Sequence, residues 1–384
     1  MLKYLSLFSG IGSPEQALKN LGVDFELFGF SEIDKYAIKS YCAVHGVDES
    51  LNLGDITKID IESLPLDIDL ITHGSPCQDF SVAGNGKGGD LGSGTRSSLM
   101  WNTVAICEHC QPKFVIWENV KNVLSKKHRH NFDKYLEEMD RIGYNNFYQV
   151  LNAKDYGVPQ NRERIFVVSI RKDLNKYFEF PKGFDNGIRL KDILEDEVDE
   201  KYYINTEKAE RLISEYKGNL AISHPIRSRE FEGTGWKDNC PTLCARDYKD
   251  PKNVIMPCIT PDRLEKRQIE GFKVKQATKK GYDIAYLGDS INLEQPNSTT
   301  RRGRVGKQIS NTLTTSCNIA AVVKMNNMEY RIRKLTPKEY WRLMGFKDEQ
   351  FLKAEQVCSN TQLYKQAGNS IVVNVMEEIF KNLI

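Results

Sequence analysis

The chain has 384 residues, of which 40% are hydrophobic and 28% charged, and its net charge is +2. This composition excludes an intrinsically disordered chain, and the length predicts two domains or one elaborated domain. Its apolar runs fall well short of the roughly 20 residues that a membrane-spanning helix needs. The N-terminus lacks the cleavage region of a signal peptide, and the nine cysteines have no disulfide-scaffold spacing, so we expect a cytoplasmic protein.

The first 170 residues alternate short apolar runs with helix-like stretches. Strands are predicted at residues 4–8, 25–30, 68–72, 114–117, 146–151 and 165–170, and helices at 14–21, 35–45, 99–107 and 132–142. Apolar strands separated by amphipathic helices predict an α/β fold, a doubly wound and mostly parallel sheet covered on both faces. Ligands of such sheets bind at the carboxyl ends of the strands.

The pattern changes after Pro181. Residues 191–201 form an acidic run, which we interpret as either a linker or a solvated helix face. Beyond it Gly, Asn, Thr and basic residues dominate. Segments 239–246 and 310–315 share a Thr-Leu motif and precede β-branched runs, which indicates a second, loop- and strand-rich domain, although chance explains the likeness equally well. Helical patterns return at 337–344 and 371–383.

The second part of the chain is basic. Residues 221–334 carry 21 Lys and Arg against 12 Asp and Glu, a charge of +9, which leaves −7 for the rest. A basic block in an acidic protein favours a polyanionic partner slightly, because solvated surface lysines would give the same count.

The loop after the first strand holds two glycines, Gly10 and Gly12, just before the first helix. Glycines there allow a tight turn and a close approach of a ligand to a helix N-terminus. Glu32 follows the second strand, where an acid can bind a ribose, although a surface acid is an equal alternative. The lysine of a phosphate-binding loop is missing, so a nucleoside-type cofactor fits better than a triphosphate.

Two further strand ends carry reactive residue types. Cys77 lies in a Pro-Cys turn after the third strand, where a thiol is a candidate nucleophile, although most cysteines are inert packing residues. Seven glycines between Gly74 and Gly94 indicate a lid. Glu118 ends the fourth strand.

Five motifs, taken together, resemble the DNA (cytosine-5)-methyltransferases. They are Phe8-x-Gly10-x-Gly12, Pro76-Cys77-Gln78, Glu118-Asn119-Val120, Gln160-x-Arg162-x-Arg164 and Gly368-Asn369-Ser370. The resemblance covers residues 5–172 and 334–384. It implies a Rossmann-like catalytic domain at 1–184, a smaller target-recognition domain at 185–332 and a return segment at 333–384 that completes the catalytic domain.

The resemblance implies the roles of four catalytic residues. Cys77 would add to C6 of a cytosine flipped out of the duplex, which activates C5 and divides one difficult step into easier ones. Glu118 would hydrogen-bond N3 and must hold a proton to do so, which implies a raised pKa. Arg164 would hold the base and Glu118, and Arg162 would lie near the cysteine and the DNA backbone.

The implied cofactor is S-adenosylmethionine. The positions that match its binding site are Phe8, Gly10, Ile11, Gly12, Glu32, Ile33, Asp55, Ile56, Pro76, Leu99, Asn369 and Ser370. Glu32 would accept from the ribose and Asp55 from the adenine amino group. Ile33 stands where the family often has an aromatic residue, so stacking on adenine is lost, and Ser75 stands where many members have phenylalanine.

The implied partner is double-stranded DNA, over which a lid at residues 78–96 would close. Candidate DNA contacts are Gln78, Ser81, Arg96, Arg227, Arg229, Arg246, Arg301, Arg302 and Arg304; for any one arginine, phosphate attraction or solvated charge outweighs base readout. No metal is expected, because the Cys107–Cys110 segment has no matched second pair.

Two alternatives to this function stay open. One is a tRNA-methylating member of the same family, and the other is a catalytically silent, sequence-specific DNA-binding protein. The long block between Pro181 and Leu335 favours DNA, and intact Cys77, Glu118 and Arg164 favour activity. We further expect a monomer, encoded by a prokaryote or phage and associated with the nucleoid, with a cognate restriction endonuclease as a candidate partner.

Overall fold

The structure is a computed structural model that describes residues 1–76, 80, 89–90, 92–203, 272–294, 298, 300–315, 319–324 and 330–384. It divides into two compact units. The first unit comprises Met1–Gly157, Glu163–Asn186 and Met344–Ile384, and the second comprises Val158–Arg162 and Gly187–Leu343. The chain thus rejoins the first unit at Met344, whereas the sequence-based interpretation begins the return segment at residue 333.

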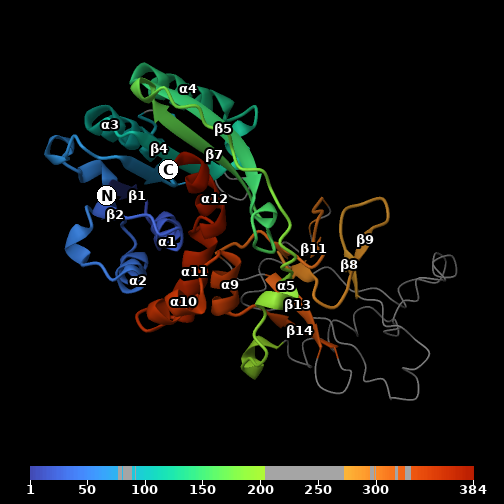
Figure 1. Cartoon of the computed structure of the whole chain (residues 1–384). Coiled ribbons are helices and arrows are strands. Elements are labelled where there is room, and N and C mark those ends of the chain that lie inside the picture. Colours follow the sequence, from blue (N-terminus) through green and yellow to red (C-terminus); the bar gives the residue numbers. More distant parts are fainter. Residues whose placement is uncertain are drawn as a thin grey trace, which may run out of the picture. The chain divides into compact units, whose positions relative to one another are not determined.

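The first unit is built on a six-stranded sheet with the order β2-β1-β3-β4-β7-β5 (Figure 1). Four neighbouring strands are parallel: β2 (Phe25–Ser31), β1 (Leu2–Leu7), β3 (Leu70–His73) and β4 (Phe114–Val120). Strand β7 (Glu163–Arg171) runs antiparallel to β4 and to the edge strand β5 (Tyr144–Asn152). The predicted α/β class and mostly parallel sheet are confirmed.

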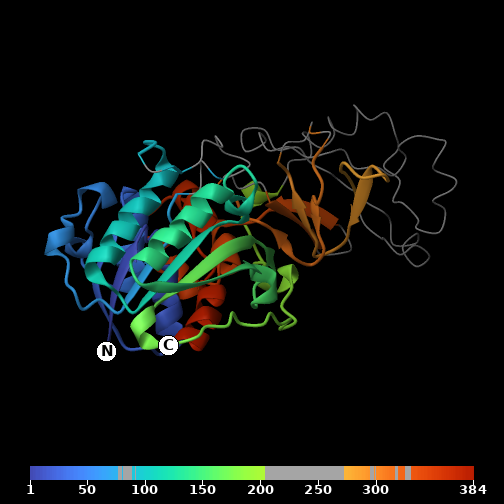
Figure 2. The same cartoon turned by 90° about the horizontal axis from the view of Figure 1, so that it is seen from above.

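Helices cover both faces of this sheet (Figures 1 and 2). Helices α3 (Met100–Cys110) and α4 (Arg129–Arg141) pack on one face. On the other, α1 (Ser13–Asn20) packs against α12 (Val373–Leu383), and α2 (Lys35–His45) packs against α10 (Asp348–Glu355) and α11 (Asn360–Asn369). One-turn 3-10 helices lie at Glu49–Leu51, Ile56–Lys58, Ile61–Ser63, Arg96–Leu99, Lys121–Leu124, Ala153–Asp155 and Lys172–Leu174.

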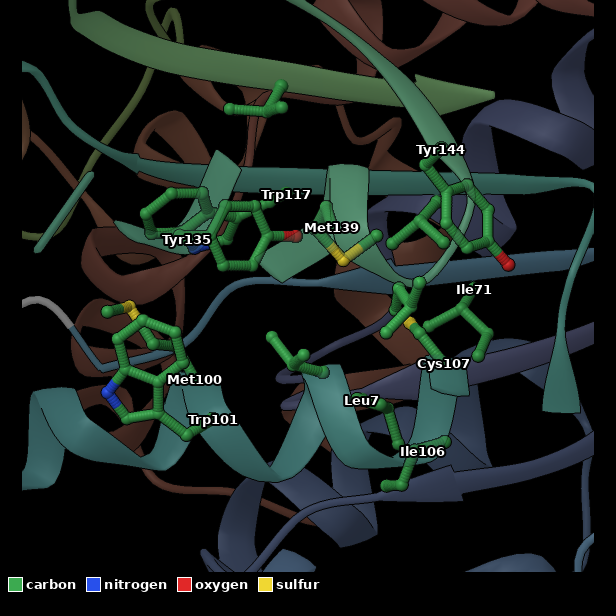
Figure 3. Close-up of a cluster of buried hydrophobic side chains, with 14 of the residues drawn as sticks. Leu7, Ile71, Met100, Trp101, Ile106, Cys107, Trp117, Tyr135, Met139 and Tyr144 are labelled. Atoms are coloured by element: carbon green, nitrogen blue, oxygen red, sulfur yellow. The ribbon is translucent and has the colours of Figure 1, made fainter. Parts of the chain in front are cut away.

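The core between the sheet and helices α3 and α4 is rich in aromatic and sulfur-containing side chains (Figure 3). Trp117 of β4 is fully buried, and its ring centroid lies 4.3 Å from that of Tyr135 of α4. Full burial of one large apolar side chain contributes roughly 1.5–3 kcal/mol. This packing fixes the end of β4, where the predicted glutamate lies.

The register of the parallel strands brings their carboxyl ends level. Four residues lie side by side across the sheet: Ser31, Leu7, His73 and Trp117. The residues that follow them are Glu32, Phe8, Gly74 and Glu118. The chain leaves β1 to form β2 on one side and later β3 on the other, so β1 and β3 flank a topological switch point, where ligands of such sheets bind.

The C-terminal segment of the first unit packs against α1. The Ser370 hydroxyl lies 2.6 Å from the Ser13 hydroxyl in a buried hydrogen bond. The Asn20 amide donates to Glu377 at 2.5 Å. The first bond lies at the start of α1, directly after the loop that follows β1, and the second lies at the end of α1.

The second unit has a four-stranded antiparallel sheet with the order β11-β10-β13-β14. Its strands are β10 (Ser290–Asn292), β11 (Val305–Gly306), β13 (Ile319–Lys324) and β14 (Tyr330–Lys334). The unit also contains the hairpin β8 (Phe272–Lys275) and β9 (Tyr282–Ala285), the parallel pair β6 (Gln160–Asn161) and β12 (Ser310–Asn311), and helices α5 (Leu190–Ile193), Glu200–Tyr202 and α9 (Pro337–Leu343). The strand-and-turn prediction for 310–315 and the β-branched run after it is confirmed by β12 and β13, and segment 239–246 lies outside the described residues.

None of the helices in the described ranges is long and apolar enough to cross a membrane.

A buried ion pair holds the second unit together. The Arg333 guanidinium donates to both carboxylate oxygens of Glu339, at 2.6 and 2.8 Å, and both side chains are at most 2% exposed. Glu339 also accepts from the backbone amides of Thr336 and Glu195, at 2.7 and 2.8 Å. The carboxylate therefore connects three segments of chain.

Replacing Arg333 with alanine should strongly destabilise this unit. The substitution leaves a buried carboxylate without its cation, which costs about 3–5 kcal/mol. Urea unfolding followed by tryptophan fluorescence would show a lower midpoint. Arg302→Ala, at an exposed position, is the control and should change stability by less than about 0.5 kcal/mol. Equal midpoints for the two variants would contradict this assignment.

Candidate active site

The turn after β1 requires glycine at its end. Phe8, Gly10 and Gly12 all have positive φ, at 53°, 57° and 77°. A Cβ at Gly12 would lie 2.1 Å from Nε2 of His45 and 2.9 Å from the ring of Tyr41. The turn therefore lies directly against helix α2, and no larger residue fits at position 12.

Buried polar side chains of α1 and α2 hold this turn in place. Nε2 of His45 lies 3.0 Å from the Ile11 carbonyl and must carry the proton of that hydrogen bond. Burial lowers the pKa of His45 to about 3, so the ring is neutral. Tyr41, one helical turn earlier, donates to Glu15 at 2.8 Å, and burial raises the pKa of Glu15. Tyr41, His45 and Glu15 are not predicted from the sequence, although the four-residue spacing of Tyr41 and His45, which puts both on one face of α2, is a signal for them.

Glu32 connects the loops that follow β1 and β2. Its carboxylate accepts from the backbone amides of Gly10 at 3.0 Å, Ile33 at 2.8 Å and Asp34 at 2.9 Å. Ile33 is 73% exposed, which is unusual for a large apolar side chain. Glu32 thus fixes the backbone on both sides of the exposed Ile33 side chain.

Asp55 lies in the next loop of the same edge. It caps the 3-10 helix Ile56–Lys58 by accepting from the backbone amide and hydroxyl of Thr57, at 3.0 and 2.8 Å. These bonds lower the pKa of Asp55 and keep it an acceptor. Ile56 beside it is buried.

The segment before the predicted nucleophile is held by buried polar side chains. Asn119 donates to the Ser75 carbonyl at 3.1 Å, and the Trp117 indole donates to the Ser75 hydroxyl at 3.0 Å. The Ser97 hydroxyl donates to the Pro76 carbonyl at 2.9 Å. Cys77, Gln78 and most of the expected lid (residues 79, 81–88 and 91, with Ser81 among them) lie outside the described residues.

Glu118 and Arg164 form an ion pair at the end of β4. Nε of Arg164 lies 3.0 Å from Oε1 of Glu118, with the side chains 17% and 12% exposed. Glu118 lies opposite Phe166 in β7, so Arg164 is its diagonal neighbour on the same face. A Cβ at Gly74 would lie 3.8 Å from Glu118 and 3.7 Å from Ile371. Residues from β4, β7, the loop after β3 and the C-terminal segment therefore converge.

Gln160 and Arg162 belong to the second unit. Gln160 is fully buried, donates to the Leu343 carbonyl at 2.7 Å and accepts from the Leu313 amide at 3.1 Å. Arg162 is 3% exposed and donates to the Leu313 carbonyl at 3.4 Å. Both side chains therefore join segment 158–162 to the rest of that unit.

The predicted DNA-contacting arginines differ in exposure. Arg96 and Arg302 are exposed, and Arg301 pairs with Glu294 at 2.9 Å. Arg304 is fully buried, and its guanidinium donates to backbone carbonyls of Glu294 at 2.7 Å and Asn292 at 3.3 Å. Its burial contradicts a direct DNA contact and makes Arg304 a structural residue. Arg227, Arg229 and Arg246 lie outside the described residues.

The remaining predicted positions lie near the same edge of the first unit's sheet. Leu99 packs against the hydrophobic core cluster, and Ser370 is buried against Ser13, while Asn369 before it is exposed.

Within the ranges that the structure describes, no group of His, Cys, Asp or Glu side chains could hold a metal ion. Cys107 and Cys110 are buried, which raises both pKa values, that of Cys110 to about 11. These thiols are therefore protonated packing residues in this structure.

Comparison with known proteins identifies the family. A family model described as C-5 cytosine-specific DNA methylase matches residues 2–384. The chain belongs to this family. It is therefore an enzyme, a DNA (cytosine-5-)-methyltransferase, and DNA is its substrate.

Similar proteins come from phages and bacteria. The orphan methyltransferase M.SPRI of Bacillus phage SPR is 36% identical, with 100% of this chain and 97% of that protein covered. The type II methyltransferase M2.ScrFI of Lactococcus lactis subsp. cremoris is 31% identical, with 100% and 99% covered. The type II methyltransferase M.HhaI of Haemophilus parahaemolyticus is 29% identical, with 100% and 94% covered.

Solved structures share the fold at lower identity. The Entamoeba histolytica methyltransferase EhMeth has a TM-score of 0.61 at 16% identity, with 100% of this chain and 98% of that chain covered. The S. pombe Dnmt2 methyltransferase has a TM-score of 0.57 at 17% identity, with 99% and 97% covered. These likenesses confirm the Rossmann-like fold of the methyltransferase.

Gly12→Ala should destabilise this methyltransferase more than Gly22→Ala. Both glycines have positive φ, 77° and 68°, so each substitution costs about 1–2 kcal/mol of backbone strain. A Cβ at Gly22 meets nothing within 4 Å, whereas at Gly12 it overlaps His45, which adds about 1–3 kcal/mol. Urea midpoints of the two variants provide the comparison. Equal losses would show that the turn can move away from α2.

Proposed function

We propose that this methyltransferase transfers a methyl group from S-adenosylmethionine to C5 of a cytosine in a specific double-stranded DNA sequence, through a covalent adduct with Cys77. The observation that carries the proposal is the Glu118–Arg164 ion pair beside Gly74, at the strand edge from which the Ser75-Pro76 segment leads into Cys77. An acid and a guanidinium in one place can bind the polar edge of a base, and the next turn along the chain supplies a thiol.

The residues at the switch point fit S-adenosylmethionine. The donor supplies an electrophilic methyl group on a sulfonium. At Gly10 a Cβ would meet nothing within 4 Å, so the turn is open there to a ligand that approaches the backbone. The carboxylates of Glu32 and Asp55 can accept from the ribose and the adenine amino group, and exposed Ile33 offers the adenine an apolar contact. Phe8, Leu99, Asn369 and Ser370 complete the proposed set.

The chain's own residues perform the covalent step. The thiolate of Cys77 forms a bond to C6, and the electron pair of the C5–C6 double bond becomes available at C5. Glu118 supplies a hydrogen bond, or a proton, to N3 as negative charge develops. Arg164, whose Nε lies 3.0 Å from Oε1 of Glu118, holds the carboxyl group in place for this contact. After methylation a base removes the C5 proton, the C6–S bond breaks and the thiolate returns.

The second unit is proposed to recognise the DNA sequence. Its basic block supplies the charge for phosphate contacts, and exposed Arg302 and the Glu294-paired Arg301 are candidates among the described residues. Exposed Arg96 is a further candidate, whereas Arg162 is 3% exposed and donates to the Leu313 carbonyl, so it supports the second unit itself. The relatives named as orphan and type II methyltransferases support action in a bacterial cytoplasm, either alone or beside a cognate endonuclease. The expected monomeric state stays a prediction.

The alternatives are disfavoured by separate observations. A tRNA-methylating enzyme is disfavoured because the matching family model describes DNA methylases along residues 2–384. A silent DNA-binding protein is disfavoured because the Glu118–Arg164 pair is formed at 3.0 Å, close to Gly74 in the segment that leads to Cys77.

Transfer of a labelled methyl group tests the proposal. Purified protein with labelled S-adenosylmethionine and mixed-sequence duplex DNA should place label on C5 of cytosine. Cys77→Ala should abolish transfer while DNA binding persists, and Glu118→Gln should slow it by about 10²–10⁴-fold, the usual contribution of general acid–base groups. Glu163→Gln, at an exposed acid on the same strand as Arg164, is the control and should keep full activity. Label in adenine, or only in RNA, would contradict the proposed function.

A further inference from the structure

Two buried serines flank the point at which the chain enters the predicted nucleophile turn. Ser97 is fully buried and Ser75 is 3% exposed. Ser97 comes from the 3-10 helix Arg96–Leu99, 21 residues after Pro76 along the chain. Neither hydroxyl is needed for apolar packing, and burying one without a partner costs about 1–3 kcal/mol.

Both hydroxyls form hydrogen bonds, one with a backbone carbonyl and the other with neighbouring side chains. Ser97 donates to the Pro76 carbonyl at 2.9 Å. The Ser75 hydroxyl accepts from the Trp117 indole at 3.0 Å and from the Asn119 amide at 3.3 Å. The Asn119 amide also donates to the Ser75 carbonyl at 3.1 Å. Two successive carbonyls, at positions 75 and 76, therefore have buried side-chain donors.

These bonds determine the direction in which the chain leaves Pro76. A peptide group is planar, so its carbonyl oxygen fixes the plane that contains the nitrogen of the next residue. The φ of proline is restricted to about −65° by its ring, which removes one of the two backbone rotations at position 76. With the carbonyl of Pro76 held by Ser97, the remaining rotation is fixed as well.

The donors also come from rigid parts of the fold. Trp117 and Asn119 are both buried, alternate along β4 and flank Glu118, whose side chain pairs with Arg164. One strand therefore sets the position of the acid that meets the base and of the segment that leads to the thiol. A displacement of about 1 Å between reacting groups can cost 10²-fold in rate.

We propose that Ser97 and Ser75 are positioning residues for the methyl-transfer reaction, which orient the Pro76 peptide so that the following cysteine meets C6 of the cytosine. The inference rests on the proposed function of Cys77. Neither serine touches the substrate, so their effect is on the rate of adduct formation rather than on the affinity for DNA or methyl donor.

The test measures the rate of covalent adduct formation on duplex DNA that contains 5-fluorocytosine, with S-adenosylmethionine present. Ser97→Ala should form adduct about 10–100-fold more slowly than the wild-type protein, with dissociation constants for DNA and S-adenosylmethionine changed less than about twofold. Ser75→Ala should show the same separation of rate from affinity. It keeps the inference testable if Ser97→Ala does not fold.

Ser98→Ala is the matched control, because Ser98 is the neighbouring serine and donates only to the Thr95 carbonyl of its own turn, at 2.6 Å, among the bonds described for it. It should form adduct at the wild-type rate. A wild-type rate for folded Ser97→Ala or Ser75→Ala would overturn the inference. Absence of adduct with the wild-type protein, or equal adduct with Cys77→Ala, would instead refute the proposed function.

Discussion

The site depends on the register of four parallel strands. Because Ser31, Leu7, His73 and Trp117 lie side by side, the loops that follow them begin at one level of the sheet. An acid, a glycine turn, the entry to the Pro-Cys turn and a second acid are thereby brought to one edge, although they are up to 110 residues apart in sequence. A shift of one strand by one residue would reverse the faces of its side chains and dismantle the arrangement.

At the end of β4, side chains that hold the neighbouring backbone alternate with the acidic side chain of the proposed active site. Successive side chains of a strand point to opposite faces. Trp117 and Asn119 hold the Ser75 segment, while Glu118 between them pairs with Arg164. At the proposed cofactor site, the same division appears in α2, where Tyr41 and His45 are buried against the glycine turn. Burial keeps His45 neutral, so no charge is buried beneath the turn, and its Nε2 donates to the Ile11 carbonyl.

The sequence predicts the catalytic unit better than the second unit, for physical reasons. Strands β1 to β4 are short apolar runs bounded by polar loops, and their ends carry the motifs. The strand prediction and the motif assignment therefore agree with each other. Helices α10 and α11 were not predicted, because their buried faces include glutamine and alanine, which weaken the apolar pattern: Gln350 and Ala354 in the first, Gln366 and Ala367 in the second. Arg304 was placed on the DNA from its basic neighbours, but its partners are carbonyls of residues 292 and 294, and no local pattern reveals such burial.

The central claim is that Cys77, and no other cysteine, attacks the cytosine held by Glu118 and Arg164. The most direct measurement is mass spectrometry of protease digests after reaction with a 5-fluorocytosine duplex. The account predicts one cross-linked peptide, whose modified residue is Cys77. In the Arg164→Ala variant this peptide should be absent although the protein is still folded. A nucleotide attached to another cysteine, or methylated product formed without any adduct, would contradict the account.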